Sequence, residues 1–221
     1  MNDYIMMIPS AIGAIISAAV YYVSVLYIDR DGTLGIKKKG YLIQDYRIWM
    51  ITVSVLISLT WIGYRFFISK TDVLRFFPYV YVAGTAVLST TDMLLHKVPN
   101  KILIILLLCW MGMVGTMLFT NVYRAMETVF FYGMSAIIAG VIFIVTYFIS
   151  QRKLGMGDVK LSLIMGLFLG NNMIIGAILY GTVLCCVFSV VQVIRKKLSM
   201  KDGVPLVPFL YLGSLIVLSI L

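Results

Sequence analysis

The sequence predicts an all-α integral membrane protein, a polytopic bundle of about eight transmembrane helices with its N-terminus outside. Hydrophobic residues make up 62% of the 221 residues and charged residues only 12%, whereas a soluble domain carries roughly 25% charged residues. Mean hydropathy is +1.02, and the apolar runs reach the roughly 20 residues that cross a bilayer as a helix. So little polar surface could not cover a globule in water.

The first two expected spans are separated by a basic loop. Tyr4–Ile28 is rich in Ile, Ala and Val, and the residues before it lack the basic start of a secretory signal peptide, so we expect a retained span. Asp29–Arg47 holds three consecutive lysines and is expected to be a cytosolic loop, after which Ile48–Ile68 crosses back. We therefore expect residues 1–72 to form a two-helix unit before a six-helix core over 73–221.

The next three expected spans are defined by the near absence of charge. Val73–Thr91 has one charged residue, close to its start, and Ile102–Thr120 and Thr128–Ser150 have none. The short polar stretches between these runs are expected to be connections at the membrane surface.

The last apolar stretches need a break. A single helix over Asp158–Ile194 would be about 55 Å long at ~1.5 Å per residue, which exceeds a hydrocarbon core of roughly 30 Å. Asn171-Asn172 is the expected break, giving a short helix over Asp158–Gly170 that must be packed by protein or cross a locally thin bilayer. The remaining spans are Met173–Ile194 and Val204–Leu221.

Charge sets the expected orientation. With the N-terminus outside, the inside loops hold 14 of the 18 basic residues, and the outside segments hold Arg65, Lys70, Arg75 and Arg124. The positive-inside rule favours this arrangement. The net charge of +9 is thus explained by topology, and no nucleic-acid partner is expected.

The cysteines do not indicate a metal or disulfide site. Cys109, Cys185 and Cys186 lie in apolar runs without a C-x-x-C pair, so we interpret them as small packing residues. Neither a metal nor a cofactor is expected.

Two of the nine acidic residues stand apart from the others. Asp92 follows an uncharged run, and Asp158 opens the short sixth span. Ionisable groups at membrane depth are costly and tend to mark function, although helix capping alone would also explain Asp158. The others lie at the terminus or in polar loops, where solvation explains them: Asp3, Asp29, Asp31, Asp45, Asp72, Glu127 and Asp202.

The neighbours of the two aspartates strengthen this hypothesis. Gly155 and Gly157 flank Met156, directly before Asp158. The small size of the two glycines lets backbone or a peptide approach closely, although a G-x-G often marks only a turn. Asp92 lies one to two turns before Pro99, which ends regular structure or begins the next helix.

Paired aspartates suit peptide hydrolysis, because like charges close together hold one proton between them. One carboxylate then activates a water, and its protonated partner serves as the acid. The only histidine, His96, has no convincing serine partner for serine-type catalysis, and we expect it to be solvated or lipid-facing.

At these residues the chain resembles the type 4 prepilin peptidase family, which includes archaeal preflagellin peptidases and belongs to the G-x-G-D intramembrane aspartic proteases. The run Gly155–Leu161 resembles the family's G-x-G-D-x-K-L motif. Asp92 followed by Val98-Pro99-Asn100 resembles its first aspartate motif. Val204–Leu210, with two prolines, is similar to the opening of its last helix.

The resemblance implies that Asp92 and Asp158 are the catalytic pair and that Gly155 and Gly157 shape the active-site loop. It implies cleavage of the basic leader of type IV prepilin or pseudopilin precursors, at the cytosolic face of the cell membrane. Expected partners are these precursors, membrane lipid, and components of pilus or secretion assemblies. Lys160 is a candidate contact for substrate or lipid, and an interfacial snorkelling lysine explains it equally well.

The sequence differs from the family in one respect, and two other functions are compatible with its acidic residues. Larger bacterial members carry a cytosolic cysteine tetrad and a segment linked to N-methylation of the pilin, whereas Asp29–Arg47 has no cysteine, so N-methyltransferase activity is not implied. Paired acids also suit a proton- or cation-coupled transporter, with the glycine-rich break forming a discontinuous helix. An inert scaffold of a secretion complex is the third hypothesis.

Overall fold

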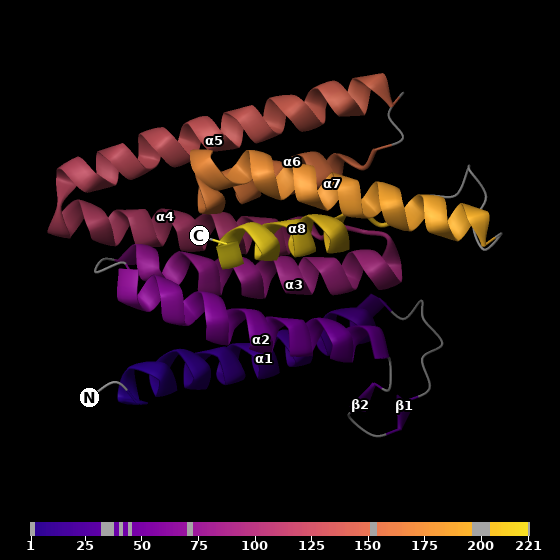
Figure 1. The fold of residues 1–221 in the computed structure, drawn as a ribbon, viewed down its shortest axis with the longest axis horizontal. Coiled ribbons are helices and arrows are strands. Elements are labelled where there is room, and N and C mark those ends of the chain that lie inside the picture. Colours follow the sequence, from indigo (N-terminus) through magenta and orange to yellow (C-terminus); the bar gives the residue numbers. More distant parts are fainter. Residues whose placement is uncertain are drawn as a thin grey trace.

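The computed structural model describes residues 3–31, 38–39, 42–43, 46–69, 73–150, 154–195 and 204–220. Within these ranges the chain forms eight α-helices, a 3-10 turn and a two-stranded hairpin. Figure 1 shows the helices lying side by side and alternating in direction, so their connections gather at the two ends of an elongated bundle. The all-helical architecture predicted from the sequence is thus confirmed, with the hairpin as an addition.

The N-terminal pair is α1 (Asp3–Asp31) and α2 (Tyr46–Ser69). A Cβ atom on Gly13 of α1 would lie only 3.3 Å from the Cβ of Leu59 in α2, which shows how closely the two helices pack. Between them, β1 (Lys38–Lys39) pairs antiparallel with β2 (Leu42–Ile43). The connection expected between the two helices thus contains a short hairpin at these four residues.

Helix α3 (Phe77–Leu95) follows the 3-10 turn η1 (Val73–Phe76) and is the most buried helix of the bundle. It contacts α1, α2, α4, α6 and α8. Its buried hydroxyl groups cost little, because Thr85, Thr90 and Thr91 donate to carbonyl oxygens one turn earlier at 2.7–2.9 Å. The predicted span ended at Thr91, four residues too early, so Asp92 lies inside the last turn of α3.

Helices α4 (Asn100–Thr120) and α5 (Val122–Ile149) are joined by Asn121 alone. The Asn121 side-chain oxygen accepts the backbone N–H of Arg124 at 3.2 Å and so caps the first turn of α5. The predicted span began at Thr128, six residues too late, because polar residues in this turn lower its hydropathy. Glu127, predicted to lie in a loop, is therefore part of a helix.

Helix α6 (Met156–Leu169) has only 14 residues and begins two residues earlier than predicted. Gly170, with a φ of 73°, separates it from α7 (Asn171–Ile194), so the break lies one residue before the expected Asn171-Asn172. Glycine is suited to this left-handed conformation. As expected, protein packs the short helix: a Cβ atom on Gly166 would collide with the backbone of Ala136 in α5.

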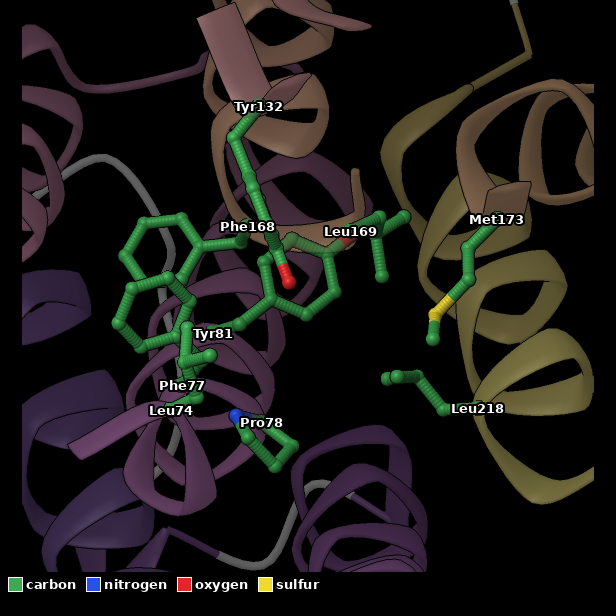
Figure 2. Close-up of a pocket in the computed structure, with 9 residues that line it drawn as sticks. All are labelled: Leu74, Phe77, Pro78, Tyr81, Tyr132, Phe168, Leu169, Met173 and Leu218. Atoms are coloured by element: carbon green, nitrogen blue, oxygen red, sulfur yellow. The ribbon is translucent and has the colours of Figure 1, made fainter. Parts of the chain in front are cut away.

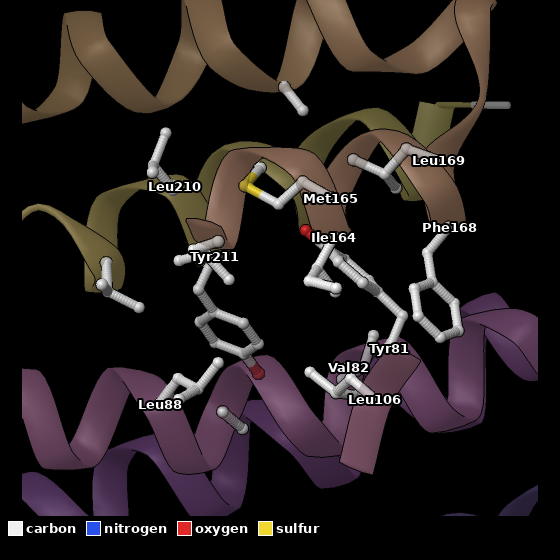
Figure 3. Close-up of a cluster of buried hydrophobic side chains, with 14 of the residues drawn as sticks. Tyr81, Val82, Leu88, Leu106, Ile164, Met165, Phe168, Leu169, Leu210 and Tyr211 are labelled. Carbon is white, nitrogen blue, oxygen red and sulfur yellow. The ribbon is translucent and has the colours of Figure 1, made fainter. Parts of the chain in front are cut away.

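The last helix, α8 (Val207–Ile220), begins three residues later than predicted and packs against α7. A Cβ atom on Gly213 would collide with backbone atoms of Ala177 and Gly181. Such close backbone approach through small residues is characteristic of helices that associate in lipid. Figure 3 shows side chains of α3, α4, α6 and α8 meeting in one core, with Tyr81, Leu106, Met165 and Leu210 among them.

Three helices of the described chain, α4, α5 and α7, are long and apolar enough to cross a membrane. Large apolar side chains also cover their outer faces, and Phe119 and Ile149 are 94% and 77% exposed. Contiguous apolar surface of this kind is rare on water-soluble proteins. The fold is therefore compatible with a membrane helical bundle.

Aromatic side chains close the end of the bundle where α3 begins and α6 ends (Figure 2). The ring of Phe77 lies 5.8 Å from that of Tyr132 and 5.7 Å from that of Phe168, both edge to face. The space left among these rings is about 10 Å³, roughly what one water molecule requires. A peptide therefore has no room in this cavity.

Candidate active site

A larger cavity of about 470 Å³ opens at the opposite end of the bundle. Its walls come from the last turn of α3, the connection 96–99 and the start of α6. The two acidic residues selected from the sequence, Asp92 and Asp158, both line it. The complete lining is Asp92, Leu95, His96, Lys97, Val98, Pro99, Asn100, Gly155, Gly157 and Asp158.

Asp92 is 7% exposed and is held by the start of α8. Its Oδ2 accepts the backbone N–H of Val207 at 3.1 Å. Val207 is the first residue of α8, where a backbone N–H has no acceptor within its own helix. The positive end of the helix dipole also favours a carboxylate at this point. Pro208 follows and has no N–H to leave unpaired.

Asp158 lies in the first turn of α6 and is half-buried. Its backbone N–H donates to the carbonyl oxygen of Gly155 at 3.0 Å, which closes the turn that begins the helix. A Cβ atom on Gly155 would stand 3.3 Å from Asp158 Oδ2. The absence of a side chain at Gly155 therefore keeps that carboxyl group free of steric contact on this side.

Two contacts hold the connection 96–99 and the start of α4 against α6. A Cβ atom on Gly157 would lie 2.7 Å from the Cβ of Val98, closer than real side chains approach. One turn further along α6, Lys160 Nζ donates to Asn100 Oδ1 at 3.1 Å. Gly157 therefore makes room for Val98 of the same chain, and Lys160 has a partner within the chain.

One known protein family matches the part of the chain that contains both aspartates. The model of the type IV leader peptidase family matches residues 79–190, about half of the chain. The chain belongs to the type IV leader peptidase family. No significant match was found among curated proteins or among solved structures. The resemblance inferred from the sequence motifs is thereby confirmed.

The match to the leader peptidase family covers the cavity but not the whole bundle. It includes Asp92, the run from Gly155 to Asp158, and Lys160, which lie in or beside helices α3 and α6. Helices α1 and α2 lie outside it, as does α8, which supplies the hydrogen bond to Asp92. The hydrogen bond from Val207 to Asp92 therefore involves a residue outside the matched range.

The arrangement places two carboxyl groups beside one cavity, with Asp92 buried and Asp158 half-buried. Asp92 and Asp158 lie close enough to interact electrostatically, and His96 also lies within electrostatic reach of Asp92. Two carboxyl groups in such a place do not readily ionise together and can hold one proton between them. The pair thus has the composition required of a general base and a general acid acting on one peptide bond.

Two contributors to the site were not selected from the sequence. His96 is exposed, in agreement with the expectation that it is solvated, and it also caps α3 in a left-handed conformation with a φ of 50° and lines the cavity. Its spacing of four residues from Asp92 was a usable signal, because such residues share a helix face. The Val207 N–H is a backbone group, so the sequence gives no signal for its bond to Asp92, although the segment Val204–Leu210 resembles the opening of the family's last helix. Among the described residues, no group of three or more His, Cys, Asp or Glu side chains could hold a metal ion.

Proposed function

We propose that this chain is an intramembrane aspartic endopeptidase that removes the basic leader of type IV prepilin or pseudopilin precursors at the cytosolic face of the cell membrane. Membership of the type IV leader peptidase family supports the peptidase class. The observation that carries the two-aspartate mechanism is that Asp92 and Asp158 line one open cavity, although they come from different helices. The aspartic type and the substrate belong to this proposal.

In the proposed mechanism Asp92 is the base. The Val207 N–H donates to Asp92 Oδ2, and a hydrogen bond of this kind favours the ionised form of the carboxyl group. It takes a proton from a water molecule while the water oxygen bonds to the carbonyl carbon of the scissile peptide. Asp158 donates a hydrogen bond to the carbonyl oxygen and then protonates the leaving nitrogen as the C–N bond breaks. Asp92 then holds the proton taken from water, and transfer of this proton to Asp158 restores the starting state. The cycle therefore needs no other proton source.

We further propose that the cavity faces the cytosol and that the eight helices span the membrane with the N-terminus outside. Lys97 lines the cavity, Lys101 lies in the first turn of the adjoining α4, and Lys160 lies at the start of the second turn of α6. Arg124 lies at the other end, in the first turn of α5. This distribution is the one that the positive-inside rule associates with a cytosolic cavity.

The transporter hypothesis is less well supported. Transport needs a polar path from the acidic pair to the other side of the membrane. In the described part of the chain, the far end of the bundle is filled by apolar and aromatic side chains around a space of about 10 Å³. A proton-flux assay in vesicles tests this alternative, because the peptidase requires no flux.

The first prediction tests the pair directly. Asp92→Asn and Asp158→Asn keep the side-chain shape but remove the base or acid, so each should lower cleavage of a reconstituted precursor at least about 100-fold. Mass spectrometry of the product measures the rate, the cut position and any N-methyl group. Glu127→Gln is the matched control, because it removes an exposed carboxylate from α5. Near-wild-type cleavage by either aspartate variant would refute the pair.

A further inference from the structure

Among the described residues that line the aspartate cavity, Asn100 alone carries a side-chain amide. It is the first residue of α4 and is exposed. Its Oδ1 accepts a hydrogen bond from Nζ of Lys160 in α6, at 3.1 Å. Lys160 is not one of the residues that line the cavity. Asn100 therefore connects Lys160 with a cavity that Lys160 does not itself line.

The bond from Lys160 decides which way the Asn100 amide faces. An ammonium group can only donate, so the amide atom that it contacts must be the oxygen. The two N–H donors on Nδ2 then point away from Lys160. Within the described ranges, the Asn100 side chain makes no other hydrogen bond, and neither Asp92 nor Asp158 accepts from it. The cavity wall therefore holds a pair of oriented donors that the described protein does not use.

The surroundings of these donors indicate which chemical group they would bind. The positive end of the α4 dipole lies at Asn100, and the cavity wall also carries Lys97, so this part of the cavity favours acceptors. A Lys or Arg side chain of the leader is excluded as the partner, because both can only donate. A peptide held between Asp92 and Asp158 offers one carbonyl oxygen per residue. Such an oxygen is the acceptor that the bound substrate itself supplies.

Packing joins the helix that carries Asp158 to these donors. A Cβ atom on Gly157 would lie only 2.7 Å from the Cβ of Val98, in the connection that leads to Asn100. Lys160 lies three residues after Gly157 and therefore on the same face of α6. The bond from Lys160 to Asn100 extends this contact to the start of α4. The orientation of the amide is thus tied to the position of the helix that begins beside Asp158.

We propose that Asn100 binds the precursor by donating from Nδ2 to a backbone carbonyl oxygen beside the scissile bond, and that Lys160 is the positioning residue that turns the amide toward this oxygen. This inference rests on the proposed function, because it adds a binding contact for the same substrate. Lys160 thus acts through Asn100 and is not itself a contact for substrate or lipid. A bond made equally before and during the reaction affects KM and leaves kcat unchanged.

Cleavage kinetics with a reconstituted precursor test both roles. Asn100→Ala removes the donors and should raise KM at least about fivefold, as expected for one hydrogen bond, with kcat changed less than about twofold. Lys160→Met keeps the apolar stem but releases the amide, and should raise KM about threefold. Adding Lys160→Met to Asn100→Ala should raise KM no further, because Lys160 acts through Asn100. Lys160→Arg keeps a donor and should retain most of the affinity.

Lys101→Met is the matched control for the loss of a lysine. Lys101 is exposed in the same first turn of α4 and is not among the residues that line the cavity, so its replacement should not raise KM. If the losses from Lys160→Met and Asn100→Ala multiply in the double variant, Lys160 acts independently and the proposal is wrong. An unchanged KM in Asn100→Ala would overturn it as well.

A scan of the substrate backbone separates binding by Asn100 from a role in folding alone. Synthetic precursors carry one ester in place of one amide at successive positions on either side of the scissile bond, because an ester carbonyl is the weaker acceptor. With the unaltered protein, the ester at one position should raise KM about threefold or more. In Asn100→Ala the same ester should have no added effect. Because an ester also removes an N–H group, only an effect that disappears in Asn100→Ala is assigned to Asn100.

The outcomes of this scan distinguish the two proposals. If every ester has the same effect on KM in the unaltered protein and in Asn100→Ala, Asn100 does not bind the substrate backbone and this inference is overturned, while the peptidase stands. If the unaltered protein cleaves no precursor at all, the proposed function fails and this inference fails with it.

Discussion

The proposed chemistry depends on two residues, Asp92 and Asp158, and a carboxylate in an apolar chain needs a reason to be there. Both can be selected from the sequence for that reason, whereas the groups that hold them cannot. The donor to Asp92 is a backbone N–H of Val207, and every residue except proline carries such a group, so the bond depends on tertiary packing.

At the scale of single residues, the proposed aspartate pair predicts how the rate of cleavage depends on pH. If Asp92 and Asp158 share one proton, low pH leaves no base and high pH leaves no acid. We therefore expect kcat/KM to fall on both sides of an optimum, by about tenfold per pH unit beyond each limb. Initial rates across the pH range measure this. A rate that rises or falls in one direction only, with the protein folded throughout, would contradict a shared proton.

At the scale of helices, hydropathy predicts which parts of the chain are helical better than it predicts where each helix begins and ends. The apolar run predicts most of α3, but its last turn is missed because the predicted span ends with the uncharged run at Thr91. The first turn of α5 was lost for a similar reason, although the capping residue Asn121 was visible in the sequence. The close approach of α6 to the connection 96–99 could not be predicted, since a glycine does not reveal what lies against it.

That close approach gives a prediction at the scale of elements. Gly157→Ala places a Cβ atom 2.7 Å from the Cβ of Val98, so α6 and the connection must move apart. A displacement of this size at an active site should lower kcat/KM at least about tenfold. Val98→Gly should restore part of the loss, because it removes the opposing Cβ.

Val98→Ala keeps that opposing atom and is the matched control for the rescue. It should not restore the activity of Gly157→Ala. Equal rescue by both Val98 variants, or full activity of Gly157→Ala alone, would show that this contact does not position the site.

For the whole molecule, the order of the helices along the chain can be predicted from the sequence, but which helices pack against one another cannot. The sequence suggested a two-helix unit beside a six-helix core. In the structure, α1 and α2 pack directly on α3, and Ser54 of α2 lies within hydrogen-bonding distance of Tyr211 in α8, at 3.1 Å. Such contacts join residues far apart in the chain, and periodicity within one helix does not reveal them.

The charge of the whole molecule leads to the last prediction. The net charge of +9 and the lysines around the cavity, Lys97 among them, repel a basic leader. An anionic bilayer attracts basic segments by about 1 kcal/mol per Lys or Arg near its surface. We therefore expect KM for the precursor to fall at least about fivefold when zwitterionic vesicles are replaced by vesicles rich in anionic lipid.

Added salt should weaken this effect, because it screens charges at the membrane surface. A precursor whose leader carries no basic residue is the control, and its KM should be the same in both lipids. If the basic precursor also shows the same KM in both, lipid does not relieve the repulsion.

The hydrogen bond between Val207 and Asp92 also has a consequence in time. A ribosome adds Asp92 and Asp158 to the growing chain well before it adds the segment that supplies the Val207 donor. A nascent chain therefore contains both acids while one still lacks its partner. The site takes its final form only after the helix that begins at Val207 has entered the bundle, so catalytic competence arrives late in biogenesis.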